Sequence, residues 1–509
     1  MHHLFKTSGL FVVLLLCLSA PAHVNGQSTA YQNPYLAKSN WPIYHANTSA
    51  TASSVNTGPG DIERVQVIDS LTQAGFGRRN APHNRLQVSP WTVMMEPYPD
   101  GTQAVITTPN DGVAKYIIRD DQLESVHFLK LDRRTLDFDW GILMLSDGRG
   151  IVTEQKKDRF VIFGDERAGD PTSPLEIKAY IDVSERRYGD LNAHFSIAPD
   201  GTLIALTEKN KLIAIDIEAR AVVAEFDLPS EGGTSFHNSF PIDKTGRIFL
   251  STQNMMAAID WHDGAFKLAW TALYDMRGPG CEDVAKTQSR RAEILAVARG
   301  KTCTGSGTTP TLLGDPDTGV VVIVDGHSPQ NNLIAFWRNA PPATWAAIAD
   351  PIGRSDKLDV RIAGVLPLPY STPDGDGFTA ENSPAAMRNG VVIAQWAGFR
   401  PGPDSPRGVQ RVDWNHAKNT LELKWANPAI HFNGVPTIAC QQIDKCKVYG
   451  MGRYGRNYGY RAVDFDTGEV TSSLSLGTDR DVLDQGNNHA VANDGSIVYS
   501  GRFKMVRIK

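Results

Sequence analysis

The sequence lacks an excess of positive charge. Its 51 Lys and Arg residues are outnumbered by 56 Asp and Glu residues, which leaves a formal net charge of -5 at pH 7. A nucleic-acid surface needs concentrated Lys and Arg, so this balance excludes a nucleic-acid partner. The motifs GxSxG and HExxH are also absent. Neither the common serine-hydrolase elbow nor the zinc-protease helix is therefore supported.

Long apolar runs are confined to the N-terminus. Residues 1–27 combine a basic start (MHHLFK), the apolar run LFVVLLLCLSA and a segment of small residues. This is the three-part pattern of a secretory signal peptide. No later run approaches the roughly 18 apolar residues of a membrane helix. The sequence predicts an exported protein, secreted or periplasmic, with no transmembrane segment after signal cleavage.

Cysteine is scarce, with five residues in the whole chain. Cys17 lies inside the apolar run and leaves with the signal. The other four are an even number in an exported chain and form no CxxC motif, so we expect two disulfides and not a metal site. Cys281 and Cys303 would close an insertion of helical composition, and Cys440 and Cys446 would tie a hairpin.

One hairpin phrase recurs along the sequence. In residues 305–325, GSGTTPTLLGDPDTGVVVIVD, an apolar strand at 309–313 precedes a turn at 315–319 and a second apolar run at 320–324. Turn residues between β-branched runs favour a β-hairpin. Similar phrases begin at five further positions: His194, His237, Glu381, Phe432 and Asn487. Repetition at roughly 40–60 residues is typical of a β-propeller.

The phrases also set the expected blade boundaries. We expect an all-β fold of eight blades, or seven if two weakly patterned early blades are one: 89–132, 142–184, 192–228, 235–274, 305–340, 381–427, 432–476 and 485–508. The last blade is short of one strand, so residues 64–69 are expected to complete it and close the ring. Residues 28–63 lack any period and are predicted to cross the propeller surface as an irregular arm. The propeller domain would then span 64–509.

Several blades end on a second phrase, in which Asp follows Ala by two residues and a turn with Gly comes next. Two copies carry it in full: Ala258, Asp260 and Gly264, and Ala462, Asp464 and Gly468. The phrase resembles the repeat of quinoprotein alcohol dehydrogenase-like (PQQ-repeat-like) β-propellers, at the level of the superfamily. Trp270 stands two residues later than that repeat requires, and Ser472 replaces the second Trp.

This resemblance implies an exported oxidoreductase that acts on a small organic molecule. Such enzymes bind pyrroloquinoline quinone with a calcium or lanthanide ion in the central funnel, often beneath a disulfide between adjacent cysteines. The chain has no adjacent cysteines and no CxxCH haem-attachment motif. The resemblance therefore supports the fold more strongly than it supports the cofactor.

The first strand of each propeller blade lines the central channel, so the residues at the starts of these strands converge at one mouth. Those positions form a polar ring: Asn192, His194, His237, Asn238, Ser239, Thr308, Thr309, Glu381, Asn382, Ser383, Asn433, Asn487, Asn488 and His489. Asn and His also terminate strands and satisfy loop backbone groups. Their recurrence from blade to blade nevertheless predicts a shared site for a small molecule.

Two chemistries suit this ring. Glu381 with the amide oxygens of Asn238, Asn382, Asn433 and Asn488 would form a cage for a hard cation such as calcium. One Glu with several Asn is similar to the channel of calcium-dependent lactonase propellers, although those have six blades. In the other chemistry, histidines of three blades act as general acid and base: His194, His237 and His489.

Substrate contacts are expected from Asn192, Thr308 and Thr309. Arg453 and Arg456 lie in GMGRYG, where a strand and not a helix follows, so the segment is a glycine-rich hairpin and not a phosphate loop. With nearby tyrosines these arginines suit an anionic or sugar-like ligand, and an exposed turn is the alternative. Three functions stay open: an oxidoreductase-like enzyme, a cation-assisted hydrolase or lyase, and a non-catalytic ligand-binding or assembly propeller.

Overall fold

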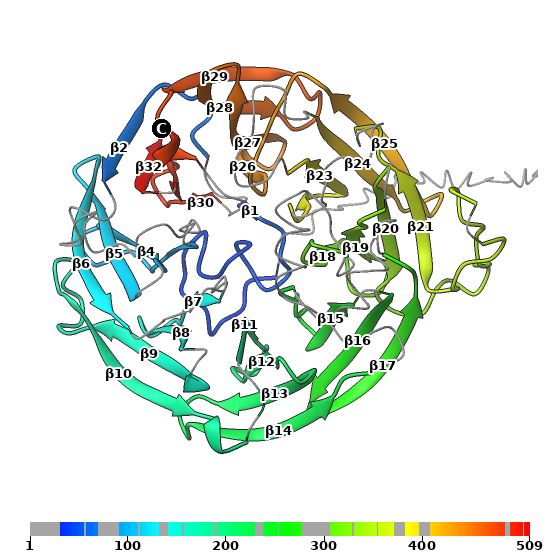
Figure 1. Ribbon diagram of the computed structural model, residues 1–509, viewed down its shortest axis with the longest axis horizontal. Helices are drawn as coiled ribbons and strands as arrows, with labels where there is room; N and C mark the ends of the chain where they lie inside the picture. The colour runs from blue at the N-terminus through cyan, green and yellow to red at the C-terminus, as the bar shows by residue number, and fades with distance from the viewer. Residues whose placement is uncertain are drawn as a thin grey trace, which may run out of the picture.

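A computed structural model of the chain describes residues 31–54, 58–69, 91–109, 112–131, 141–154, 157–186, 188, 191–229, 238–252, 254–276, 306–327, 330–353, 355–370, 382–396, 408–483, 489–501 and 503–509. Over these ranges the chain forms eight β-sheets, which stand around a central channel as the blades of a propeller (Figure 1). The predicted eight-bladed, all-β fold is confirmed, and the seven-bladed alternative is wrong.

Each sheet runs from the channel to the rim. The strands of blades 1 to 4 are β3 (Thr92–Met94), β4 (Gln103–Thr107), β5 (Gly112–Arg119) and β6 (Gln122–Lys130); β7 (Ile142–Met144), β8 (Gly150–Glu154), β9 (Arg159–Asp165) and β10 (Leu175–Asp182); β11 (Leu191–Ile197), β12 (Leu203–Thr207), β13 (Lys211–Asp216) and β14 (Ala221–Asp227); and β15 (Arg247–Ser251), β16 (Met255–His262) and β17 (Ala265–Leu273). In blade 4 an isolated bridge between Ile242 and Ile248 marks the innermost position.

The second half of the ring repeats this plan. The strands of blades 5 to 8 are β18 (Thr311–Leu313), β19 (Val320–Val324), β20 (Asn332–Trp337) and β21 (Ile362–Pro367); β22 (Ala385–Met387), β23 (Gly390–Ala394), β24 (Val409–Asn415) and β25 (Thr420–Asn427); β1 (Ser53–Ser54), β26 (Thr437–Gln442), β27 (Lys445–Tyr454), β28 (Asn457–Asp464) and β29 (Val470–Gly477); and β2 (Val65–Asp69), β32 (Lys504–Ile508), β31 (Ile497–Ser500) and β30 (Ala490–Val491). Two short 3-10 helices, η3 (Ser184–Arg186) and η4 (Arg480–Val482), lie between blades.

Burial explains why the inner strands are continuously apolar whereas the rim strands alternate in burial. All five residues of β19 are buried, because neighbouring blades cover both of its faces. In β14, at the rim, half-buried residues alternate with exposed ones, as expected of a sheet with one face in water. The recurring hairpin phrase is therefore the buried inner half of each blade. Blade 5 extends further than predicted, because its outermost strand β21 follows a long connection after β20.

The last blade is closed by the N-terminal strand, as predicted. Strand β2 pairs antiparallel with β32, with Val65 opposite Ile508. The carbonyl of Lys509 also accepts hydrogen bonds from the backbone N–H groups of Glu63 and Arg64. This pairing covers the edge that the three C-terminal strands would otherwise leave open.

Two tryptophans on outermost strands bind the next blade along. Trp270 of β17 donates from Nε1 to the carbonyl of Arg338, at 3.2 Å, and Trp425 of β25 donates to the carbonyl of Phe465, at 2.8 Å. Gly468 packs against the Trp425 ring, has a φ of +76° and leaves no room for a Cβ. In blade 7 the Gly of the Ala-x-Asp and Gly phrase therefore has a physical role, since it receives the tryptophan of the blade before. In blade 4 nothing lies within 4 Å of the position that a Cβ of Gly264 would take.

The N-terminal arm, residues 31–54, does not cross the propeller surface, and that prediction is wrong. The arm fills the central channel (blue in Figure 1), where Trp41 and Ile43 are buried. Six innermost-strand N–H groups donate to its carbonyls over 2.7–3.1 Å: Met94 to Trp41, Met144 to Pro42, Ile242 to Thr48, Leu312 to Ser49, Ala386 to Thr51 and Ile438 to Ala52. Innermost strands present an unpaired edge to the channel, and the arm supplies the missing acceptors.

Arm side chains reach the two remaining blades. Asn33 donates to the carbonyl of Ile197 in blade 3, at 3.0 Å, and Asn40 donates to the carbonyl of Ala492 in blade 8, at 3.3 Å. The arm therefore contacts all eight blades. Asn47, the acceptor of an Asn-Thr-Ser glycosylation sequon, is buried within the arm and cannot carry a glycan in this fold.

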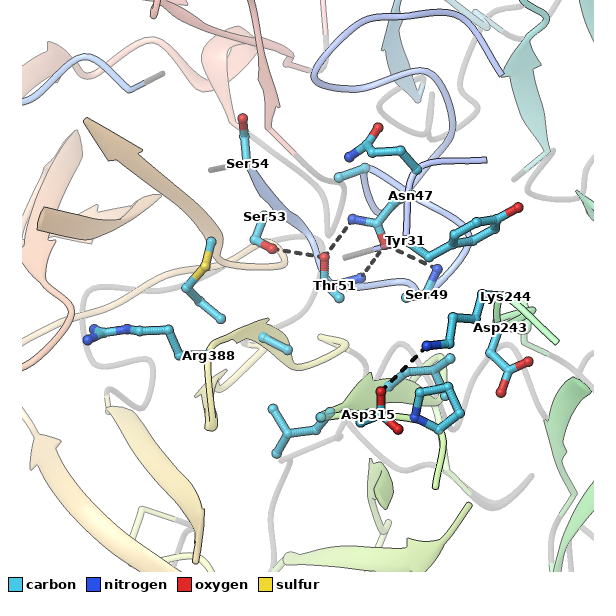
Figure 2. A pocket seen from close by; sticks show the side chains of 18 of the residues that line it. Tyr31, Asn47, Ser49, Thr51, Ser53, Ser54, Asp243, Lys244, Asp315 and Arg388 are labelled. Carbon is cyan, nitrogen blue, oxygen red and sulfur yellow. Dashed lines mark hydrogen bonds and ion pairs between the residues drawn. The ribbon is translucent and has the colours of Figure 1, made fainter. Parts of the chain in front are cut away.

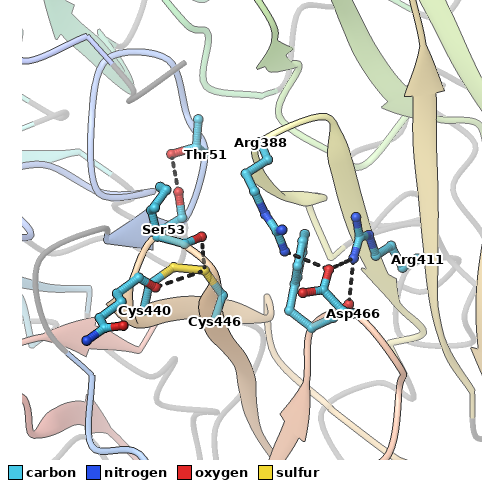
Figure 3. The surroundings of a disulfide bond; sticks show 10 residues. Thr51, Ser53, Arg388, Arg411, Cys440, Cys446 and Asp466 are labelled. Atoms are coloured by element: carbon cyan, nitrogen blue, oxygen red, sulfur yellow. Dashed lines mark hydrogen bonds and ion pairs between the residues drawn. A yellow bond between two sulfur atoms is a disulfide. The ribbon is translucent and has the colours of Figure 1, made fainter. Parts of the chain in front are cut away.

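One predicted disulfide is confirmed. Cys440 and Cys446 are bonded across the hairpin that joins β26 to β27 (Figure 3). The predicted signal peptide and the predicted Cys281–Cys303 bond lie outside the described residues. Within the described residues, no helix has the length and apolar character needed to cross a membrane.

Candidate functional site

The channel has two mouths. The innermost strands begin at one, which we call the strand-start mouth, and the hairpins that lead to the second strands lie at the other, the hairpin mouth. Thr309 and Ser383, just before β18 and β22, mark the strand-start mouth. The two residues are in contact, because the Thr309 backbone N–H donates to the Ser383 hydroxyl at 2.9 Å. The predicted convergence of strand starts is therefore seen for these two blades.

Thr309 is the centre of a buried chain of polar groups. Its hydroxyl lies 3.1 Å from Nε2 of His45 and is also hydrogen-bonded to the Ser239 hydroxyl. His45, Ser239, Thr309 and Ser383 are all at least nine-tenths buried. Four segments of the chain thus place an imidazole and three hydroxyls in contact at one end of the channel.

His45 is held in an unusual environment. Its backbone φ is +57°, a left-handed conformation that residues with a Cβ seldom adopt. Burial, with a smaller contribution from the neighbouring His194, lowers the pKa of His45 to about 3, so the imidazole is neutral at physiological pH. The ring packs edge-on against Trp91, at 5.4 Å between centroids. Its Nδ1 is buried without a hydrogen-bond partner among the described residues.

The neighbouring loop, residues 306–309, is fixed by its own hydrogen bonds. The Asn238 amide donates to the carbonyls of Ser306 and Thr308, at 2.6 and 3.3 Å. The Thr308 hydroxyl accepts the N–H of Val324 at 3.1 Å. Asn238 is predicted as a metal ligand and Thr308 as a substrate contact. In the structure both stabilise the loop that holds Thr309 in place.

Asn382 and His194 also lie at this mouth. Both are buried, and Asn382 donates to the carbonyl of Ala394 at 3.4 Å. Its Oδ1 is buried and has no hydrogen-bond partner among the residues that the structure describes. A buried acceptor without a partner is costly, and a ligand or ordered water at this position would satisfy it.

Other predicted site residues are placed elsewhere. His489 is fully buried, stacked on Tyr499 at 4.4 Å and hydrogen-bonded through Nδ1 to the Tyr460 hydroxyl at 2.8 Å. Asn433 is fully buried, and its backbone N–H bonds the carbonyl of Met451. His489 is therefore enclosed by tyrosines of blades 7 and 8, and Asn433 lies just before β26.

Arg453 and Arg456 lie at the end of the β27–β28 hairpin, where Arg456 is exposed. Arg453 stands over the Tyr458 ring at 5.9 Å, and its Nε donates to the carbonyl of Gly455. Asn192 lies in β11, and nothing is described of its side chain. Four predicted site residues lie outside the described part of the chain: His237, Glu381, Asn487 and Asn488.

The described groups do not fit a hard metal ion. A calcium or lanthanide ion takes oxygen ligands with carboxylates among them, whereas the described residues of this mouth present hydroxyls, an amide and imidazoles. Within the described ranges no cluster of three or more His, Cys, Asp or Glu side chains is arranged to hold a metal. The predicted carboxylate ligand, Glu381, is not among them. No chemical step is therefore assigned to a metal or quinone here.

Sequence reasoning missed His45. The sequence pattern places it in an arm without period, and the predicted channel site draws on strand starts alone. A usable signal was present, because the otherwise polar arm contains the dense apolar run Trp41-Pro42-Ile43-Tyr44 directly before it. Such a run favours a buried segment. Ser239 and Ser383 were placed in the ring without a role.

Comparison with known proteins gives the fold and little more. No family model matches the chain. An uncharacterised protein of Archaeoglobus fulgidus is 24% identical over 335 residues, which cover 62% of this chain and 59% of that relative. The match thus spans about three-fifths of the relative's length.

Two solved structures illustrate the likeness. A europium-containing methanol dehydrogenase is 11% identical, with 92% of this chain and 89% of that chain covered and a TM-score of 0.51. BamB from Moraxella catarrhalis is 14% identical, with 72% and 95% covered and a TM-score of 0.36. The likeness to the methanol dehydrogenase, at 11% identity, shows a propeller fold alone, and one fold carries many chemistries.

Proposed function

We propose that this protein is an exported, oxidoreductase-like enzyme that binds a small, uncharged organic molecule at the strand-start mouth. The observation that carries the proposal is the buried contact of His45 and Ser239 with the Thr309 hydroxyl. Buried polar groups with unused hydrogen-bonding capacity, at the end of a propeller channel, are what a small-molecule site requires. The quinoprotein-like repeat phrase supports the oxidoreductase class.

The neutral charge of the site selects the kind of ligand. With the pKa of His45 lowered to about 3, its imidazole carries no charge at pH 7, and the hydroxyls of Ser239 and Thr309 are neutral as well. An ionic ligand would lose its hydration there without gaining a counter-charge, which is costly. A hydroxyl group would instead exchange hydrogen bonds with water for a bond to the Thr309 hydroxyl and one that it donates to the Oδ1 of Asn382. A carbonyl group could accept from Thr309 only.

His45 and His194 take different roles in this proposal. His45 is a poor proton acceptor because its pKa lies far below physiological pH. It orients the Thr309 hydroxyl, and so is a positioning residue. His194, the neighbouring imidazole, is the proposed acceptor of the substrate's hydroxyl proton. Oxidation would also pass the hydride equivalent from the substrate's carbinol carbon to an external electron acceptor, whose place the redox dye takes in the assay below, and the alcohol would leave as a carbonyl compound.

Export is supported by two features. The N-terminal 27 residues have the signal-peptide pattern, and the Cys440–Cys446 disulfide suits an oxidising compartment. The proposed location is therefore the periplasm or the extracellular space.

The decisive experiment uses protein purified from its native host. A quinone chromophore in the absorption spectrum, with dye-coupled oxidation of short alcohols, supports the oxidoreductase proposal. Bound calcium without a chromophore, with lactone hydrolysis, would replace it by the hydrolase alternative. In either assay we expect His194→Gln to lower kcat by about 10²–10⁴. Thr309→Val should raise KM more than it lowers kcat.

His262→Gln is the matched control, because this histidine lies on an exposed turn of blade 4 with its side chain 80% exposed. It should leave kcat and KM unchanged. If no chromophore, metal or turnover is found and the His194 variant binds ligands as the wild type does, the enzyme proposal fails and a binding module remains.

A further inference from the structure

The hairpin mouth contains a cavity that the proposed function does not use. Its volume is about 530 Å³, within the roughly 300–1,000 Å³ typical of small-molecule pockets. The arm forms one wall, and the hairpin turns of blades 4, 5 and 6 form the other (Figure 2). It is therefore built from segments that only the complete ring brings together.

The arm wall is polar and already ordered. Asn47 lies at its centre, where Nδ2 donates to the Thr51 hydroxyl at 2.7 Å and Oδ1 accepts the Ser49 N–H at 3.1 Å. Ser53 donates to the same Thr51 hydroxyl at 2.8 Å (Figure 2). A ligand meets hydroxyls and amides that need no further ordering, which lowers the entropic cost of binding.

The charges on the opposite wall are paired. Arg338 and Asp243 form an ion pair at 2.8 Å, with both side chains only 4% exposed. Lys244 and Asp315 face each other at 3.5 Å and are each about half exposed (Figure 2). Each pair brings one donor group and one acceptor group to the cavity with no surplus charge.

The third lining cation is neutralised from outside the cavity. Arg388 lies 2.7 Å from Asp466, which also accepts from Arg411 (Figure 3). The described lining therefore offers no net attraction to an anion or a cation. What it offers is a mixture of donors and acceptors, and a hydroxyl group matches both at once.

We propose that this cavity binds a neutral saccharide of one or two units. A sugar carries several hydroxyls, each both donor and acceptor, and its C–H faces pack on aromatic rings. Tyr31 supplies such a ring beside the arm wall (Figure 2). The site is separate from the strand-start mouth and does not depend on the enzyme proposal.

Calorimetric titration with maltose, cellobiose, lactose and sucrose tests this proposal. We expect at least one to bind with a Kd below about 1 mM. The double variant Lys244→Ala/Asp315→Ala, which removes a donor and an acceptor from the exposed pair, should weaken that binding at least tenfold. Lys244→Gln/Asp315→Asn keeps hydrogen-bonding groups without charge and should stay within about threefold of the wild type.

Two controls make the result specific. Lys418→Ala/Glu422→Ala removes an exposed pair of the same kind on the β24–β25 turn, at 3.0 Å and outside the cavity, and should have no effect. His194→Gln should also leave sugar binding unchanged, so failure of the enzyme proposal is distinguishable. No binding at about 10 mM, equal binding by the alanine double variant, or binding only of charged probes such as glucuronate or spermidine would overturn the proposal.

Discussion

The two mouths of the channel differ in charge although one arm lines both. Among the described residues, the polar groups at the strand-start mouth are buried, with His45 neutral beside Thr309. The hairpin mouth is open and carries ion pairs such as Lys244–Asp315. Burial decides the difference, since an unpaired charge is expensive where water is excluded and inexpensive where water remains. A propeller channel can thus hold two chemically unlike sites on one axis.

Replacing Trp41 by Ala should disturb both mouths together and have the largest effect. The side chain is fully buried in an apolar cluster that includes Met94 of blade 1 and Ile438 of blade 7. Loss of a buried tryptophan leaves a cavity and typically costs about 3–5 kcal/mol. Guanidinium unfolding measures this loss. Leu423→Ala, at a residue 45% exposed on β25, should change stability by no more than about 0.5 kcal/mol.

Acid should act on the strand-start mouth through His45. The pKa of His45 is lowered from 6.5 to about 3 in the folded protein, so its contribution is present above pH 6.5 and is lost as pH falls towards 3. By linkage, the shifted pKa of His45 lowers the free energy of unfolding by about 2–3 kcal/mol between pH 7 and 4.5. Urea unfolding at both pH values should show a smaller loss in His45→Asn, which also tolerates the left-handed backbone. Equal losses would show that His45 titrates normally.

Lys244→Ala should leave stability almost unchanged. Its partner Asp315 lies 3.5 Å away, and both side chains are about half exposed, so water screens the pair. Exposed pairs contribute about 0–1 kcal/mol, and we expect a loss below about 0.5 kcal/mol in the same unfolding assay. A loss above about 1 kcal/mol would mean that the hairpin mouth is drier than its exposure indicates.

The fold could be predicted because its signals are local. The β18–β19 hairpin follows from turn residues between β-branched runs, and β2 was identified because blade 8 lacked a strand. The arm could not be placed in the same way. Its contacts run through carbonyls such as those of Thr48 and Ser49, and any residue type supplies a carbonyl.

The candidate site was predictable only in part. Thr309 lies just before β18 and His194 lies within β11, and both were found from the expected positions of the innermost strands. His45 comes from the arm, about 260 residues earlier in the chain than Thr309, and no spacing rule relates the two. Asn433 and His489 fitted the positional rule, but both are fully buried in the interior of the last blades. Sequence position at a strand start does not say whether a side chain faces the channel or a neighbouring blade.

The pairing of β2 with β32 has a consequence for how the chain folds. Val65 meets Ile508 only after the last residues have been synthesised, and the arm before it needs inner strands from every blade. The N-terminal arm and β2 are synthesised first, but their pairing partners are completed last. Such long-range closure slows folding, and it makes assembly depend on both chain ends: a product truncated at either terminus would lose the outer strand of blade 8 or that strand's partner.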